Sequence, residues 1–75
     1  MNSRDIIIDT DYIQLGKFLK LADIIDSGGS AKYFLADFTV LINGESDQRR
    51  GRKLYPNDLI DIEEFGKFRI VKEEK

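Results

Sequence analysis

The sequence TVLING at residues 39–44 carries the clearest local structural signal in this chain. Its first four residues are rich in side chains that favour β-strands, and Asn43 and Gly44 follow them directly. Asparagine and glycine tolerate the positive φ angles that a two-residue hairpin turn requires. The stretch therefore predicts a strand that ends in a tight hairpin.

Two helices are predicted before this hairpin, because apolar residues recur there at helical spacing. The first helix should run from Leu15 to near Ile25, and Ser27 is suited to cap the second. The apolar faces consist of Leu15, Phe18, Leu19 and Ala22 in the first helix and Ala31, Phe34 and Leu35 in the second.

Further strand and turn signals lie outside this central region. Residues 6–8 are three isoleucines, which predict a short strand or an extended arm. Residues 55–58 form a proline-containing turn before a strand at 59–62, and residues 64–66 turn the chain into a last strand at 67–71. Residues 72–75 are predicted to be a frayed charged tail. The pattern gives an α+β fold in which two helices pack on a short antiparallel sheet.

Length and composition restrict what such a chain does. Its 75 residues suffice for one domain, and they contain neither cysteine nor histidine, which excludes disulfides and the common zinc sites. Three isoleucines are too few for a secretory or membrane-spanning segment, so we expect a soluble cytoplasmic protein without a membrane partner. The expected divisions are residues 1–14 as an arm or short strand, 15–62 as the core, and 63–75 as the last strand and tail.

Acidic residues are numerous, and Asp61, Glu63 and Glu64 are close enough in sequence to suggest acid–base catalysis or a metal site. The alternative is that they occupy solvent-facing positions of a strand and a turn. A core this small leaves little room for a sequestered catalytic cleft. We therefore predict that the protein is not an enzyme and uses no cofactor and no metal.

Positive charge is concentrated in one short segment of a negatively charged chain. Arg49, Arg50, Arg52 and Lys53 are four of twelve cations, and the net charge is −2. Without these four, eight cations stand against fourteen acidic residues, a net charge of −6. Arginine forks suit phosphates and base edges, which favours RNA or DNA as a partner. The alternative is a solvated loop that Glu45 and Asp47 neutralise.

A second candidate site is the turn at Ser27, Gly28 and Gly29, where bare backbone N–H groups could approach an anion. The alternative is a flexible turn between helices, and the spacing is not that of a Walker A loop. Lys32 and Tyr33 follow just inside the second helix. A cation and an aromatic ring could meet RNA there, although a tyrosine at this place is as often part of the core.

The order of these features resembles the S-four domain, a small RNA-binding module also called the αL motif. The resemblance covers residues 15–62. It is carried by LGKFLKLAD at 15–23, SGG at 27–29, AKYFL at 31–35, VLING at 40–44, RRGRKL at 49–54 and NDLI at 57–60. Within that family the chain is most similar to minimal stand-alone bacterial proteins called YaaA-like.

The resemblance implies a two-helix αL motif that binds structured RNA together with the adjoining hairpin. It implies Lys17, Lys20, Lys32 and the basic cluster as phosphate contacts, with Arg49 and Arg50 the first candidates for contacts to base edges. Many relatives carry arginines where this chain has Gln14 and Gly28. The cluster must therefore supply more of the RNA contact here than in typical relatives.

The function expected from sequence is recognition of structured RNA by an accessory factor. Ribosomal RNA or a ribosomal particle is the first expectation, transfer RNA the second, and the protein is expected to be a monomer. The acidic remainder would repel RNA from the other faces. The alternative is a protein-interaction module whose basic loop docks an acidic partner, with the isoleucine arm adding a strand to that partner or to a second copy.

Overall fold

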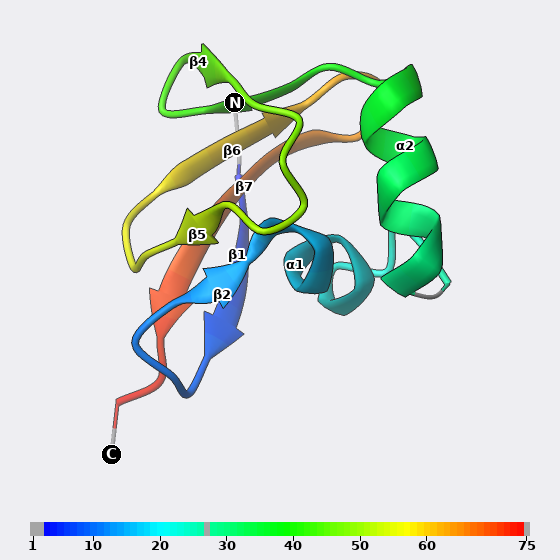
Figure 1. Cartoon of the computed structure of the whole chain (residues 1–75). Coiled ribbons are helices and arrows are strands. Elements are labelled where there is room, and N and C mark those ends of the chain that lie inside the picture. Colours follow the sequence, from blue (N-terminus) through cyan, green and yellow to red (C-terminus); the bar gives the residue numbers. More distant parts are fainter. Residues whose placement is uncertain (1–2, 27, 75) are drawn as a thin grey trace.

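The computed structural model describes residues 3–26 and 28–74 and has an α+β fold with two sheets (Figure 1). A two-stranded ribbon joins β2 (Ile13–Gln14) to β5 (Lys53–Leu54). The larger sheet has five strands in the order β1 (Arg4–Ile8), β7 (Gly66–Lys72), β6 (Leu59–Ile62), β3 (Val40–Ile42) and β4 (Glu45–Ser46).

The larger sheet is mixed, so the prediction of an antiparallel sheet is wrong at one edge. The isoleucines of β1 pair in parallel with β7, with Ile6 opposite Ile70, whereas the other strand pairs are antiparallel. Hairpin signals report neighbours in sequence, and β1 pairs with a strand from the other end of the chain. Ile6 and Ile8 are buried while Ile7 is exposed, as the two-residue period of a strand requires.

The predicted hairpin is confirmed between β3 and β4. Asn43 and Gly44 have φ angles of 52° and 90°, as in a type I′ turn. The Asn43 side chain also reaches the next turn, because its Nδ2 donates to Asp58 Oδ1 at 3.0 Å and its Oδ1 accepts from the Leu59 N–H at 3.0 Å. The proline-containing turn at residues 55–58 is likewise present, with Asn57 at a φ of 77°. Two turns are thus fastened to each other by side chains.

The first helix, α1 (Leu15–Leu21), ends earlier than predicted. Asp23 adopts a φ of 64° and donates its N–H to the Lys20 carbonyl at 3.0 Å, while the Ile24 N–H reaches the Leu19 carbonyl at 2.9 Å. These bonds form the Schellman closure that usually has glycine at the left-handed position. Ile25 is nevertheless buried, so the apolar spacing continues beyond the point where the helix stops.

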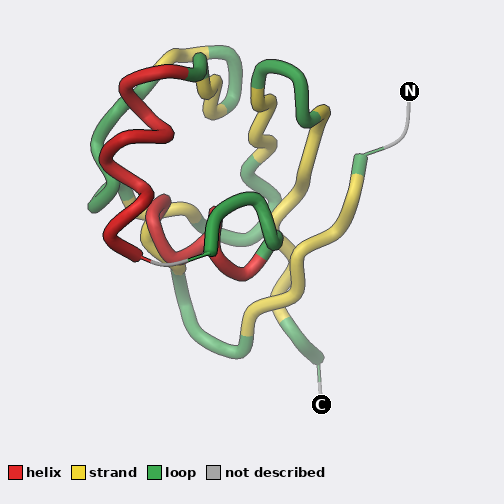
Figure 2. Tube along the Cα trace, turned by 90° about the vertical axis from the view of Figure 1, so that its right-hand side faces the viewer, coloured by secondary structure: helices red, strands yellow, loops and turns green. Residues whose placement is uncertain are grey.

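The second helix, α2 (Ala31–Asp37), follows a 3₁₀ turn, η1 (Gly28–Ser30), and Ser30 occupies its N-cap position. Ser27, predicted as the cap, lies outside the described residues. Figure 2 shows α2 on the side of the molecule away from the strand that leads from the N-terminus.

The core lies between the two helices and the inner faces of the strands. Phe18 of α1 is fully buried and meets Phe68 of β7 edge to face, with ring centroids 5.6 Å apart. Leu54 of the short ribbon is also fully buried. Leu54 therefore anchors β5, and with it the residues that directly precede this strand, to the core.

The charged tail begins later than predicted. Lys72 is the last residue of β7, and its Nζ lies 2.8 Å from Asp11 Oδ1. The Glu73 N–H donates to the Ile8 carbonyl at 2.7 Å. The contacts of the last strand with β1 and with Asp11 thus continue as far as Lys72 and Glu73.

Replacing Leu54 by alanine should lower the free energy of unfolding by about 2–5 kcal/mol, because the substitution leaves a cavity in the core. Urea denaturation followed by circular dichroism measures this loss. Leu59→Ala is the matched control, since Leu59 is exposed and its truncation should change stability by no more than about 0.5 kcal/mol. Equal losses in the two variants would contradict the assignment of Leu54 as a core anchor.

Candidate nucleic-acid interface

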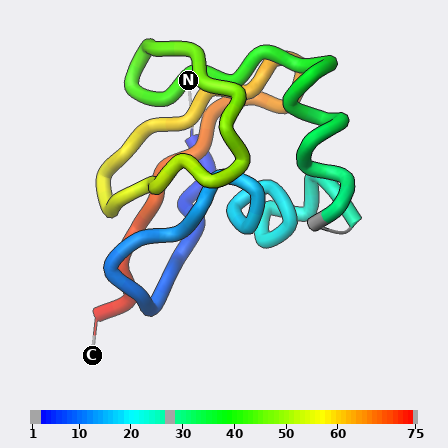
Figure 3. The backbone as a smooth tube through the Cα atoms, in the orientation of Figure 1, coloured from blue at the N-terminus to red at the C-terminus, as the bar shows by residue number. Residues whose placement is uncertain are grey.

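The basic segment, defined as residues 48–53, lies across the N-terminal end of α1. Figure 3 shows it in yellow-green, reaching the start of the helix in blue. The N–H of Leu15 donates to the Arg52 carbonyl and that of Gly16 to the Arg50 carbonyl, both at 2.8 Å. The first N–H groups of a helix have no partner within the helix, so the basic segment satisfies two of them. Its cationic side chains therefore project from a backbone that is fixed to α1.

Gly16 lies at this contact. A Cβ atom at this position would lie 3.4 Å from both the Cβ and the carbonyl oxygen of Arg50, and 3.5 Å from the Cβ of Ala31 in α2, which is ordinary van der Waals contact. The α1 helix, the α2 helix and the basic segment therefore meet at Gly16.

Asp47 holds two of the clustered arginines. Its Oδ1 accepts from Arg49 Nε at 3.1 Å, and its Oδ2 accepts from Arg49 Nη2 at 2.8 Å and from Arg52 Nη1 at 2.9 Å. These hydrogen bonds, the side-chain bonds from Arg49 first, hold the pKa of the Asp47 carboxyl well below its usual range. The alternative, a cluster neutralised by nearby acids, therefore holds for Arg49 and Arg52, which pair with Asp47, whereas Glu45 takes part in none of the ion pairs of the described residues.

A groove separates the basic segment from α2. It has a volume of about 420 Å³ and is lined by Lys32, Leu35, Ala36, Gln48 and Arg50. Gln48 Nε2 donates to the Leu35 carbonyl at 3.2 Å, which ties the segment to the helix across one end of the groove. The structure thus brings Lys32 and Arg50, two predicted site residues, to the same hollow.

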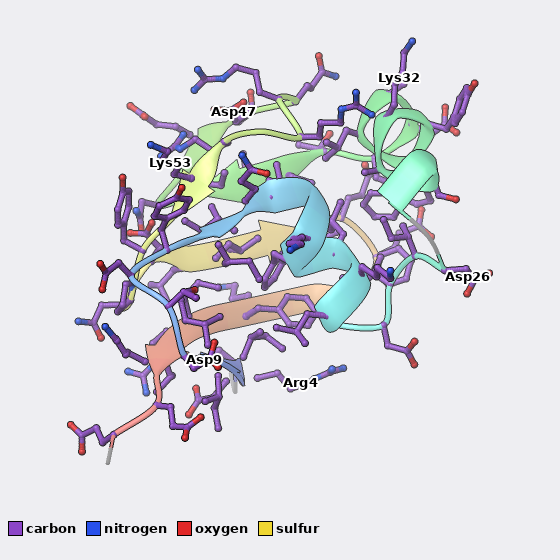
Figure 4. All side chains as sticks on the ribbon, turned by 60° about the horizontal axis from the view of Figure 1, so that its bottom comes forward. Arg4, Asp9, Asp26, Lys32, Asp47 and Lys53 are labelled. Carbon is purple, nitrogen blue, oxygen red and sulfur yellow. The ribbon has the colours of Figure 1, made fainter. Side chains whose placement is uncertain are left out.

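Lys17 and Lys20 lie elsewhere. Both are exposed on α1, and Lys17 lines a separate hollow of about 690 Å³ together with Asp9, Gln14 and Glu73. In the view of Figure 4, Asp47, Lys53 and Lys32 lie toward one edge of the molecule, and Asp9 lies toward the opposite edge. Lys17 therefore borders a different hollow from Lys32 and Arg50, and Arg49 borders a third one of about 460 Å³.

The remaining residues predicted for the site are Ser27, Gly28, Gly29 and Tyr33. Gly28 and Gly29 form the 3₁₀ turn, and Ser27 lies outside the described residues. Tyr33 is 71% exposed, so it is not part of the core. Among the residues described, no cluster of acidic side chains is placed to hold a metal ion, and no helix is long and apolar enough to cross a membrane.

Sequence reasoning missed Gln48 as a groove residue and overlooked the surroundings of Lys53. The Lys53 ammonium lies 4.8 Å from the ring centroid of Tyr12, within range of a cation–π interaction. The two-residue strands β2 and β5 that create this contact are too short to produce a detectable period.

The model of the S4 domain matches residues 6–71 of the chain. The chain belongs to the S4 (S-four) domain family. The match begins in β1 and ends in β7, so the S4 domain also includes these two strands, which lie outside residues 15–62. A similar protein of Bacillus subtilis (strain 168), named "Probable ribosome maturation protein RlbA", is 61% identical over 66 residues, which are 88% of this chain and 93% of that protein.

Replacing Asp47 by asparagine should destabilise this S4 domain in a pH-dependent way. Because the pKa of Asp47 is lower in the folded state than its ordinary 3.8, its stabilising effect is complete above about pH 4 and is lost as the pH falls toward the folded-state pKa. Urea unfolding of both proteins between pH 2 and pH 7 measures the difference. A difference that stays constant down to pH 2 would contradict the role of the ionised carboxylate.

Proposed function

We propose that this S4 domain binds structured RNA, with ribosomal RNA as the first target and transfer RNA as the second, and that it acts without catalysis in ribosome maturation. The proposal includes a monomeric protein in the cytoplasm. It also includes recognition through a two-helix αL arrangement together with the basic segment. The observation that carries it is the groove between the segment and α2.

The groove has the chemistry that an RNA backbone requires. Lys32 and Arg50 provide positive charge on its two sides, and in the described part of the chain neither forms an ion pair. Gln48 adds an amide that can accept or donate a hydrogen bond. Structured RNA is recognised largely through phosphates, 2′-hydroxyls and shape, which suits two cations separated by an open groove.

The arginines held by Asp47 retain capacity for RNA. A guanidinium has five N–H donors, and Arg49 uses two of its nitrogens on Asp47 while its side chain stays 74% exposed. The carboxylate fixes the orientation of the fork and reduces repulsion within the cluster. Arg49, Arg52 and Lys53 are therefore proposed as additional phosphate contacts. Lys17, Lys20, Ser27, Gly28, Gly29 and Tyr33 remain proposed RNA contacts.

The ribosomal target rests on the relative. Its name assigns it to ribosome maturation, and 61% identity over nearly its whole length supports the same process for this protein. The alternative of a protein-interaction module receives less support, because the isoleucine arm is paired with β7 of its own domain.

Crosslinking in living cells, followed by sequencing of the bound RNA positions, tests the proposal directly. The wild-type protein should be recovered on a small set of ribosomal RNA sites. A variant with Arg49, Arg50, Arg52 and Lys53 changed to alanine should lose those sites. Equal recovery of the same sites by both proteins would exclude the basic segment as the RNA contact.

The groove itself is tested by Lys32→Ala combined with Arg50→Ala. If both side chains neutralise a phosphate, the slope of log affinity against log salt for ribosomal RNA should become shallower by about 1.4–1.8. Lys67→Ala is the control. Lys67 is an exposed cation of β7 that lines a different hollow, and its removal should leave the slope unchanged. The same loss in both proteins would indicate general charge attraction instead of a site.

A further inference from the structure

Two half-exposed tyrosines lie side by side at the end of the β2–β5 ribbon. Tyr12 precedes β2, and Tyr55 follows β5, which continues from the basic segment. Ile13 pairs with Leu54 in the antiparallel ribbon, so Tyr12 and Tyr55 continue the register opposite each other. Their ring centroids are 6.0 Å apart with an angle of 52° between the ring planes. Tyr12 is 40% exposed and Tyr55 is 48% exposed. The pair thus presents aromatic surface to solvent.

The backbone beneath both rings is fixed by hydrogen bonds. The Tyr55 N–H donates to Asp58 Oδ2 at 2.9 Å, and the Asp58 N–H donates to the Tyr55 carbonyl at 3.0 Å. On the other strand, Thr10 Oγ1 donates to the Tyr12 carbonyl at 2.7 Å. The backbone that carries the rings is therefore ordered before any ligand arrives, which lowers the entropic cost of binding.

Charge around the pair favours an RNA ligand. Lys53, the last cation of the basic segment, has its ammonium 4.8 Å from the centroid of Tyr12. Two acids lie close to the rings. Asp11 is paired with Lys72 at 2.8 Å, and both carboxylate oxygens of Asp58 accept hydrogen bonds, from the Tyr55 N–H and from Asn43 Nδ2. A nucleotide held here would meet aromatic surface and a cation together, the combination that proteins use to bind unpaired bases.

We propose that Tyr55 is a stacking platform for an unpaired base of the bound RNA, with Tyr12 as the ring that supports it. Lys53 lies over the ring of Tyr12, which leaves Tyr55 as the ring with the freer surface. The inference rests on the proposed function and extends it. The basic segment and α2 hold phosphates, and the tyrosine pair selects RNA in which a base is available outside a helix.

The test compares two 20-base-pair RNA duplexes, one perfect and one with a single central unpaired 2-aminopurine. Wild-type protein should bind the bulged duplex about tenfold more tightly and quench the 2-aminopurine fluorescence, since stacking on an aromatic ring provides the difference. Tyr55→Phe should keep the ratio and the quenching. Tyr55→Leu should bring the ratio close to one and abolish the quenching.

Phe65→Leu is the matched control, because Phe65 is a 45% exposed aromatic residue in the β6–β7 turn whose ring packs against Phe34 and Phe38 and not against either tyrosine. It should keep the ratio of the wild type. Thermal unfolding of each variant identifies any loss of the folded protein, and ratios are compared at a temperature where all are folded.

The outcomes separate the two proposals. A tenfold ratio that survives in Tyr55→Leu, or a wild-type ratio of one with salt-sensitive binding of both duplexes, would overturn the stacking site alone. Failure of the wild type to bind either duplex at low salt would overturn RNA binding itself and the stacking site with it.

Discussion

The two hydrogen bonds from the start of α1 to the carbonyls of the basic segment are the interaction on which the candidate site depends. They link a helix that packs in the core to a loop that carries a third of the chain's cations. Without them, two helix N–H groups would lack protein partners, and the middle of the basic segment would be held only through Gln48 and Leu54 at its two ends. The two backbones meet at Gly16, beside Ala31 of α2. These two hydrogen bonds thus stabilise the start of α1 and at the same time position the cations of the basic segment.

The like charges of the basic segment repel one another, and the carboxylate of Asp47 reduces this repulsion. Asp47 binds Arg49 through two nitrogens and Arg52 through one, which leaves Arg50 and Lys53 unneutralised by that carboxylate. The segment is therefore divided into cations that Asp47 holds and cations that Asp47 does not contact. Arg50 faces α2, and Lys53 lies on Tyr12. The sequence shows only the total charge of such a segment.

Much of the fold is readable from sequence where the signal is local. The hairpin at Asn43, both helices and the last strands follow from turn chemistry and periodicity. Three features escape such reasoning. Asp23 stops α1 without the usual glycine, β2 and β5 are too short to show a period, and β1 pairs with a strand sixty residues away along the chain. For the site, residue types identified the cations, but only tertiary packing brings Lys32 and Arg50 to one hollow and places Lys17 at another.

The parallel pairing of β1 with β7 has a consequence for the order of events during synthesis. Ile6 and Ile8 enter the core only beside Phe68 and Ile70, so the first strand emerges from the ribosome long before its neighbour exists. Closing so long a loop is entropically costly and slow compared with forming a hairpin. The central hairpin and helices can assemble earlier, while the β1 edge must wait. The sheet can therefore be completed only after β7 has been translated.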